Sequence, residues 1–195
     1  MKQFSIENSF NLEDFIQMEQ IEHTYFLEEN ITPASEVLKW YQKNPYTCIG
    51  IRDKENKIIA SVNILPLKKE IFDDIYYNKF KEADITEEQI EIYEENKTYY
   101  LYLSAISIDK EHRNSIIVFK MLLKSILEMF EELERKQIKI EALLAEASTI
   151  HGEKICKKML NMKFVESTNH ESDIYYLEGK DIEKIVKLVN KILKK

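Results

Sequence analysis

Residues 99–134 constrain the fold of this chain more than any other segment. Residues 99–108 form an aromatic and β-branched run with apolar groups at both alternating sets of positions, which is typical of a strand in the middle of a sheet. Seven polar residues follow (109–115), and the apolar positions of residues 115–135 then recur every 3.6 residues. The segment therefore predicts a central strand, a polar elbow and a long helix that packs on the sheet.

Strict alternation assigns the side chains of the central strand to two faces. One face carries Tyr100, Tyr102, Ser104, Ile106 and Ile108, and the other carries Leu101, Leu103, Ala105 and Ser107. The elbow after this strand indicates an anion site, because the free amides and positive dipole end of a helix bind phosphate. It lacks the glycines that phosphate-binding loops normally use.

The rest of the chain alternates helix and strand signals. N-cap residues and apolar periodicity predict helices over about 12–26, 33–43 and 152–162, and a C-terminal helix (181–195) capped by Asp181. β-rich runs predict strands over 47–51, 57–65, 138–145, 164–165 and 174–177. Residues 69–98 form an acidic insert, which a capping box between Thr86 and Gln89 predicts to be partly helical.

Composition limits the class of protein. With 195 residues, 44% hydrophobic and 32% charged, the chain is long enough for one sizeable core, so we expect a single α/β (α+β) domain over 1–195. It has no 18-residue apolar run and no signal-peptide pattern, which predicts a cytoplasmic protein with no membrane contact. Two unrelated cysteines and four isolated histidines show no ligand spacing, so we expect no metal site.

Most of the net charge of −7 comes from the insert, where ten acidic and four basic residues give a balance of −6. This distribution argues against a nucleic-acid interface, which needs a basic face. It is compatible with a cationic amine substrate. A solvated acidic helical insert explains the same charges without any ligand.

The order of these elements resembles that of the GNAT acetyltransferase superfamily, from Leu12 to Leu177. Residues 104–113 resemble the family's fourth strand and the approach to its pyrophosphate loop. Residues 154–164 resemble the helix that ends in the family's "klGF" signature. Leu65-Pro66-Leu67 followed by the insert resembles bacterial members with extra helices between strands three and four. The resemblance implies a mixed, mostly antiparallel sheet with splayed central strands, flanked by helices.

The resemblance also implies that acetyl-CoA is the co-substrate and an amine the acyl acceptor. Its pantetheine arm would pair with the backbone of Ile106, Ser107 and Ile108. Its pyrophosphate would lie on the start of the next helix, at Arg113, Asn114, Ser115, Ile116, Ile117 and Val118. The acceptor would be a small-molecule or peptide amine, and the protein a monomer or homodimer.

Catalytic residues are less clearly marked. Some members use a glutamate on the fourth strand as a base, but this strand offers Tyr102 and no carboxylate. Glu146, just past the fifth strand, is the nearest candidate base, and Tyr102 is the other candidate catalytic residue. His112 and His151 flank the cofactor region, and either could serve as a base. Solvated surface positions are the alternative for Glu146 and for both histidines.

Departures from the family pattern support a second hypothesis. The loop pattern Q/R-x-x-G-x-G/A falls on 113–118, so Arg113 matches while Ile116 and Val118 occupy the small positions. The family's acid tyrosine corresponds to Met159, and the glycine of "klGF" corresponds to Lys163. A GNAT-like domain that has lost cofactor chemistry and acts as a binding module would show these changes.

Two structural features separate these hypotheses. An open V between the central strands, with free amides at 114–118, favours the transferase, and a groove plugged by Ile116 favours the binding module. A third hypothesis, a transcription regulator that uses its lysine-rich terminal helix, is weaker because lysines opposite an apolar stripe are usually a solvated face.

Overall fold

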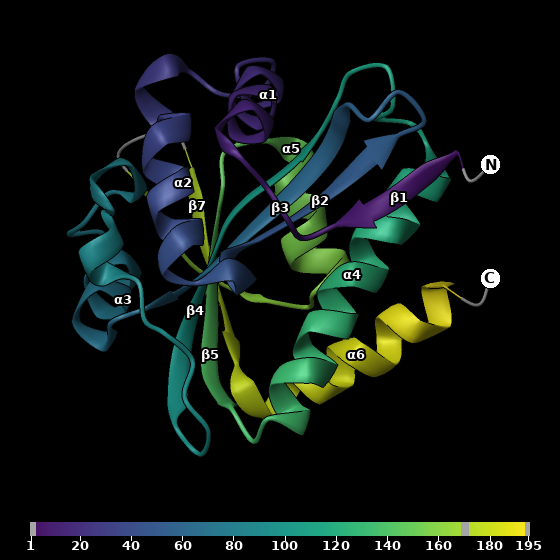
Figure 1. The fold of residues 1–195 in the computed structure, drawn as a ribbon. Coiled ribbons are helices and arrows are strands. Elements are labelled where there is room, and N and C mark those ends of the chain that lie inside the picture. Colours follow the sequence, from purple (N-terminus) through teal and green to yellow (C-terminus); the bar gives the residue numbers. More distant parts are fainter. Residues whose placement is uncertain (1–2, 169–171, 194–195) are drawn as a thin grey trace.

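In the described residues, seven strands form one mixed sheet (Figure 1). The computed structural model describes residues 3–168 and 172–193. Along the sheet the order is β1 (Phe4–Glu7), β2 (Cys48–Asp53), β3 (Ile58–Leu67), β4 (Thr98–Ile108), β5 (Lys139–Ala147), β7 (Asp173–Glu178) and β6 (Lys163–Ser167). Neighbouring strands are antiparallel except β4 and β5, which run parallel. The mixed, mostly antiparallel sheet predicted from the sequence is confirmed.

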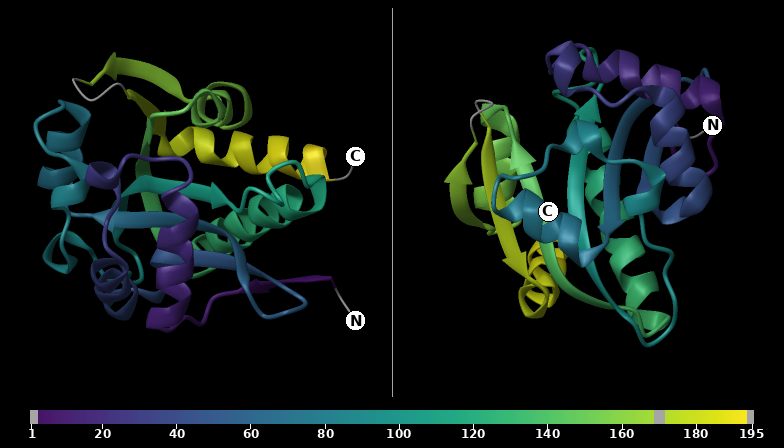
Figure 2. Two further views of the ribbon diagram at one scale, coloured as in Figure 1. Left: turned by 90° about the horizontal axis from the view of Figure 1, so that it is seen from above. Right: turned by 90° about the vertical axis from the view of Figure 1, so that its left-hand side faces the viewer.

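Helices cover both faces of the sheet (Figures 1 and 2). Their bounds are α1 (Leu12–Glu22), α2 (Ala34–Lys43), α3 (Lys69–Tyr76), α4 (Ile116–Arg135), α5 (Ile150–Lys154), which continues as a π-helical turn (Ile155–Met159), and α6 (Gly179–Leu193). One core cluster packs α4, α6 and the α5 segment on one face, and a second packs α1, α2 and α3 on the other. Among the described residues, no helix combines the length and apolar character needed to cross a bilayer.

Several predicted boundaries are wrong for local reasons. The edge strand β1 is missing from the prediction, because only four residues alternate there. Helix α1 ends at Glu22 rather than near residue 26, because the backbone changes there to i→i−3 hydrogen bonds: the amides of Thr24 and Tyr25 donate to the carbonyls of Ile21 and Glu22. The C-terminal helix begins before Asp181, at Gly179, where an added Cβ would lie 1.8 Å from a backbone oxygen of β5.

The insert and the α5 segment also differ from the prediction. The acidic insert contains α3 and two 3-10 turns, Glu82–Asp84 and Glu87–Gln89. Its first helix stops where Asn78 takes a left-handed conformation with φ of 54°. The predicted capping box between Thr86 and Gln89 is present, although it opens only a short turn. The helix predicted over 152–162 begins earlier, at Ile150, because Thr149 caps it.

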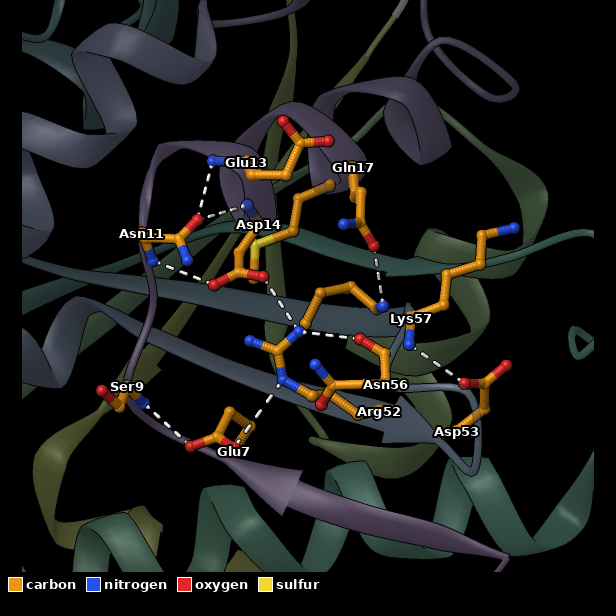
Figure 3. A network of polar contacts seen from close by, with 12 residues as sticks. Glu7, Ser9, Asn11, Glu13, Asp14, Gln17, Arg52, Asp53, Asn56 and Lys57 are labelled. Carbon is orange, nitrogen blue, oxygen red and sulfur yellow. Dashed lines mark hydrogen bonds and ion pairs between the residues drawn. The ribbon is translucent and has the colours of Figure 1, made fainter.

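A buried ion pair fixes the first turn of α1 to the edge of the sheet (Figure 3). The guanidinium of Arg52 in β2 lies 2.9 Å from the carboxylate of Asp14 and 3.7 Å from that of Glu7 in β1. Burial by itself raises the pKa of Asp14, but hydrogen bonds from Arg52 and from the Asn11 amide bring it below its ordinary value. The network sets the direction of α1, whose far end carries Glu22 towards the middle of the sheet.

Candidate active site

Strand β4 pairs with β5 only over its first half. Their parallel ladder runs from Thr98 opposite Lys139 to Leu103 opposite Ala145 and stops there. Figure 1 shows the two strands side by side in this paired part. β4 continues to Ile108 against β3 alone, and a cavity of about 820 Å³ opens beside its free edge. The splayed central strands predicted from the sequence are therefore present.

A β-bulge at Ser104 lies where the two strands part. In the β3–β4 ladder, the residues before and after it, Leu103 and Ala105, pair with consecutive residues of β3, so Ser104 is an extra residue. A bulge bends its strand and interrupts the regular pairing. The bend explains why β4 leaves β5 immediately after Leu103.

The bulge also changes which way the side chains of β4 point. Tyr102 belongs to the core cluster on the α1–α3 face, whereas Ile106 and Ile108 pack against the cluster on the α4 face. The prediction that these three residues share one face is therefore wrong. Strict alternation fails because one extra residue shifts the side-chain period by one position.

Backbone alternation determines which residues of the predicted edge face the cavity. The amide of Asp109 donates to the carbonyl of Ile59 in β3 at 2.8 Å. In an antiparallel pair this directs the backbone groups of Ser107 towards β3 and those of Ile106 and Ile108 towards the open edge. Ile106 and Ile108 line the cavity, and Ser107 is buried against β3.

Tyr25, in the turn after α1, occupies part of this edge. Its hydroxyl donates a hydrogen bond to the carbonyl oxygen of Ile108. The guanidinium of Arg113 lies over its ring, 5.5 Å from the centroid. Tyr25 therefore joins the N-terminal segment to the elbow, and it leaves the backbone of Ile106 facing the cavity.

The elbow between β4 and α4 presents free amides. Ser115 caps α4, and its Oγ accepts from the amide of Val118 at 3.3 Å. Among the described residues, the amides of Asn114, Ile116 and Ile117 have no hydrogen-bond partner. Unpaired amides at a helix N-terminus, with the positive end of the helix dipole, bind anions.

The elbow forms without glycine because its backbone needs none. None of residues 109–118 has a positive φ, so the β-branched residues there are not strained. The side chain of Ile116 is 70% exposed and that of Val118 is fully buried in the core. Neither lines the cavity, so Ile116 does not plug the groove.

The cavity has opposite charges on its two sides. The α4–α5 side contributes Arg113, Lys154 and Lys158 to its lining. The side formed by α1 and the insert contributes Glu22 and Glu82, together with Lys81 and the exposed Glu29. An anionic ligand group is therefore favoured on the first side and a cationic group on the second.

Glu82, from the first 3-10 turn of the insert, places a carboxylate beside β4. Its Oε2 accepts a 2.7 Å hydrogen bond from the hydroxyl of Tyr102, and its Oε1 accepts one from the hydroxyl of Ser104. Burial raises the pKa of Glu82 to about 7; the two hydroxyl groups oppose this rise, and the nearby Glu146 adds to it. A carboxylate with a pKa near neutrality can take a proton from an amine.

The two predicted catalytic residues lie next to Glu82. The hydroxyl of Tyr102 is 3.5 Å from Oε2 of Glu146, and Oε1 of Glu146 accepts a hydrogen bond from Ser172. Burial raises the pKa of Tyr102 well above its ordinary value, so the phenol stays protonated. Tyr102 therefore acts as a hydrogen-bond donor that orients Glu82.

The other candidate residues divide between the cavity and its surroundings. His151 and Met159 line the cavity, as does Cys156, whose pKa burial raises to about 12, so that its thiol is not ionised at neutral pH. His112 does not line it and packs edge-on against Phe4, with 5.8 Å between ring centroids. Among the described residues, no group of three or more potential ligands could hold a metal.

Sequence reasoning missed Glu82, Glu22 and Tyr25. Glu82 is one of ten acids in the insert, and only the apolar residues near it, Phe80 and Ile85, distinguish it from a solvated charge. Glu22 and Tyr25 fall at the end of α1, where the helix pattern gives no indication of a cavity.

Comparison with known proteins gives the fold. No family model and no curated protein matches the sequence. Among solved structures, Ard1 from Thermoplasma volcanium is similar over 90% of this chain and 95% of its own, with a TM-score of 0.56 and 12% identity. The NatC complex bound to Gag peptide and CoA contains a chain similar over 91% and 99%, with a TM-score of 0.58 and 9% identity. A GNAT-like decarboxylase, GphF, in complex with isobutyryl-CoA, is similar over 91% and 99%, with a TM-score of 0.59 and 10% identity. The resemblance inferred from the sequence is confirmed at the level of the fold: this chain has the GNAT fold.

Proposed function

We propose that this protein is an acetyl-CoA-dependent N-acetyltransferase that acetylates a primary amine. The observation that carries the proposal is the open split between β4 and β5, which leads directly to the carboxylate of Glu82. Two of the proteins with the same fold are described as bound to CoA or to isobutyryl-CoA. That description supports the choice of a coenzyme A thioester as co-substrate.

The residues along the split fit such a thioester. Ile106 offers the backbone groups of an unpaired strand edge to the amide-containing arm. The amides of Asn114, Ile116 and Ile117 would hold the pyrophosphate, and the guanidinium of Arg113 adds positive charge beside them. When bound, acetyl-CoA supplies the acetyl group as a thioester.

Glu82 would make the amine nucleophilic. An alkylammonium has no free electron pair, so it must lose a proton before it can attack the acetyl carbonyl. Glu82, with its pKa near 7, takes that proton, while Tyr102 and Ser104 hold its two oxygens in place. The C–N bond then forms, the C–S bond breaks, and the coenzyme leaves as a thiolate. The second proton of the attacking nitrogen passes to this thiolate, so the products are the neutral amide and the coenzyme thiol. Glu146 stabilises the ammonium before it is deprotonated.

The negative charge near Glu82 and Glu146 favours acetylation of an amine over decarboxylation. A decarboxylase must bind a carboxylate, and Glu82 and Glu146 would repel one. A cationic amine is attracted by the same pair. The charge on the pocket therefore separates the two activities described for proteins with this fold.

Calorimetry with acetyl-CoA tests the first half of the proposal. We expect binding in the micromolar range, and the Ser115→Ala variant should bind more weakly because the amide array at the start of α4 loses its cap. Absence of both heat and thermal stabilisation at millimolar acetyl-CoA would support the binding-module hypothesis instead.

Thiol release with a panel of primary amines tests the second half. We expect turnover by the wild-type protein and a loss of about 10²- to 10⁴-fold in kcat for Glu82→Gln. Glu88→Gln is the matched control, because Glu88 is an exposed acid in the same insert. Equal activity of the two variants would remove Glu82 from the mechanism.

A further inference from the structure

The cavity has a deep recess between α1, α2 and β3. Its walls carry four polar side chains, Glu22, Thr32, Trp40 and Asn63, which all line the cavity. Each is at least nine-tenths buried, with exposed fractions of 9%, 6%, 1% and 4% respectively. Buried polar groups are normally paired, so four of them around one space need an explanation.

Three of these side chains have atoms without partners. Among the described residues, no hydrogen bond reaches Oγ1 of Thr32, Nε1 of Trp40 or Oδ1 of Asn63. Leaving such atoms unpaired in the folded protein is unfavourable, because they have lost their hydrogen bonds to water. A ligand that enters the recess and bonds to them would recover this stability.

Glu22 gives the recess its charge preference. Burial, together with the negative charges of Glu82 and Glu19, raises the pKa of Glu22 to about 8. Lys81 is the one cationic residue that lines this side among the described residues. A cation placed beside Glu22 would favour its ionised form.

The acceptor atoms match one particular group. A primary ammonium has three N–H donors. The recess offers three kinds of acceptor, the carboxylate of Glu22, the hydroxyl of Thr32 and the amide oxygen of Asn63. The indole N–H of Trp40 is a hydrogen-bond donor. A bound cation would favour the ionised carboxylate of Glu22, and an ionised carboxylate is a good acceptor for this N–H.

We propose that the acetyl acceptor is a small aliphatic diamine, with its reacting amine beside Glu82 and its second ammonium in the Glu22–Thr32–Asn63 recess. This inference rests on the proposed acetyltransferase function and names its substrate class. Binding at two cation sites orients the chain of the diamine along the acidic side of the cavity. Arg113, Lys154 and Lys158 lie on the opposite side, where they attract the phosphates of the co-substrate.

The test compares 1,4-diaminobutane with butylamine, which lacks the second ammonium. We expect kcat/KM for the diamine to exceed that for the monoamine by about 100-fold, mostly through KM, because hydrogen bonds to charged groups contribute this much to binding. In Glu22→Gln the ratio should fall towards one. In Glu28→Gln, an exposed control outside the cavity lining, it should keep its wild-type value.

The outcomes separate this inference from the proposed function. If butylamine is acetylated as fast as diamines of three, four and five carbons, the diamine proposal is refuted. The proposed acetyltransferase function would still stand. If no amine is acetylated, calorimetry of 1,4-diaminobutane with the protein alone decides. If the wild-type protein binds 1,4-diaminobutane and Glu22→Gln does not, the proposed ammonium site in the recess is supported. If the wild-type protein does not bind the diamine, this site is refuted. Thermal melts of both variants check that they are folded.

Discussion

Replacing Glu22 by glutamine should make the protein more stable at alkaline pH. Glu22 is 9% exposed, and its carboxyl accepts no hydrogen bond from the described residues. Folding raises its pKa from an ordinary 4.5 to about 8, by burial first and then by Glu82 and Glu19. Ionising it in the folded protein therefore costs up to about 5 kcal/mol, and about 2 kcal/mol if the surroundings relax around the charge.

The pH dependence has a definite sign. Below pH 4.5 the carboxyl is protonated in both states and contributes nothing. Between pH 4.5 and about 8 it is ionised in the unfolded chain but protonated in the folded one, so the free energy of unfolding falls as pH rises. Above pH 8 the full cost is present. Glutamine does not titrate, so the advantage of the variant should grow from near zero at pH 4.5 to about 2–5 kcal/mol at pH 9.

Urea unfolding at pH 5, 7 and 9 measures this difference. Fluorescence of Trp40, the single tryptophan, reports on the region because its ring is buried in the same recess. The dependence of the free energy of unfolding on urea concentration should be the same in both proteins. The difference in stability should therefore appear as a shift of the urea midpoint. Glu28→Gln should follow the wild type. If Glu22→Gln shows the same pH dependence as the wild type, the burial argument for Glu22 is wrong.

Three further predictions concern single sites. Removing the carboxylate of Glu82 should abolish the acidic limb of the kcat/KM profile near pH 7, which a pH series with the best amine would show. Ile116→Ala should leave the Kd of acetyl-CoA within about 2-fold by calorimetry, because the side chain points to solvent; a large change would restore an obstructing role. Gly179→Ala should destabilise the protein by about 3 kcal/mol or more in urea, since its Cβ would lie 1.8 Å from the carbonyl oxygen of Ile140. A smaller effect would mean that the backbone shifts easily there.

Local signals in the sequence were sufficient to predict β4, the elbow and α4. The apolar run of β4, the N-cap at Ser115 and the 3.6-residue periodicity of α4 each depend on neighbours in the chain. The order of strand, elbow and helix followed from them, and so did the position of the elbow beside the cavity. Arg113 and Asn114, which the family pattern assigns to the cofactor, both line this cavity.

The acceptor side depends on contacts between distant segments, and no local pattern reports them. Glu82 meets Tyr102 across 20 positions of sequence, and Glu22 meets Asn63 only because α1 packs over β3. The bulge at Ser104 also leaves no signal in the sequence, because a serine is compatible both with a regular strand and with a bulge. The sequence therefore identified the strand that carries the site and misassigned the faces of its second half.

The extra residue at Ser104 gives one strand two roles. Before it, Tyr102 points to the acidic side and donates a hydrogen bond to Glu82; after it, Ile106 and Ile108 turn to the other face and leave their backbone along the split. Deleting that single residue would bring the whole second half of the strand back into phase with the first. The isoleucines would then project into the acceptor side, and the ladder could close against β5. The separation of the Glu82 side from the open edge of β4 therefore depends on a one-residue shift of the side-chain period, which makes this position far less tolerant of deletion than of substitution.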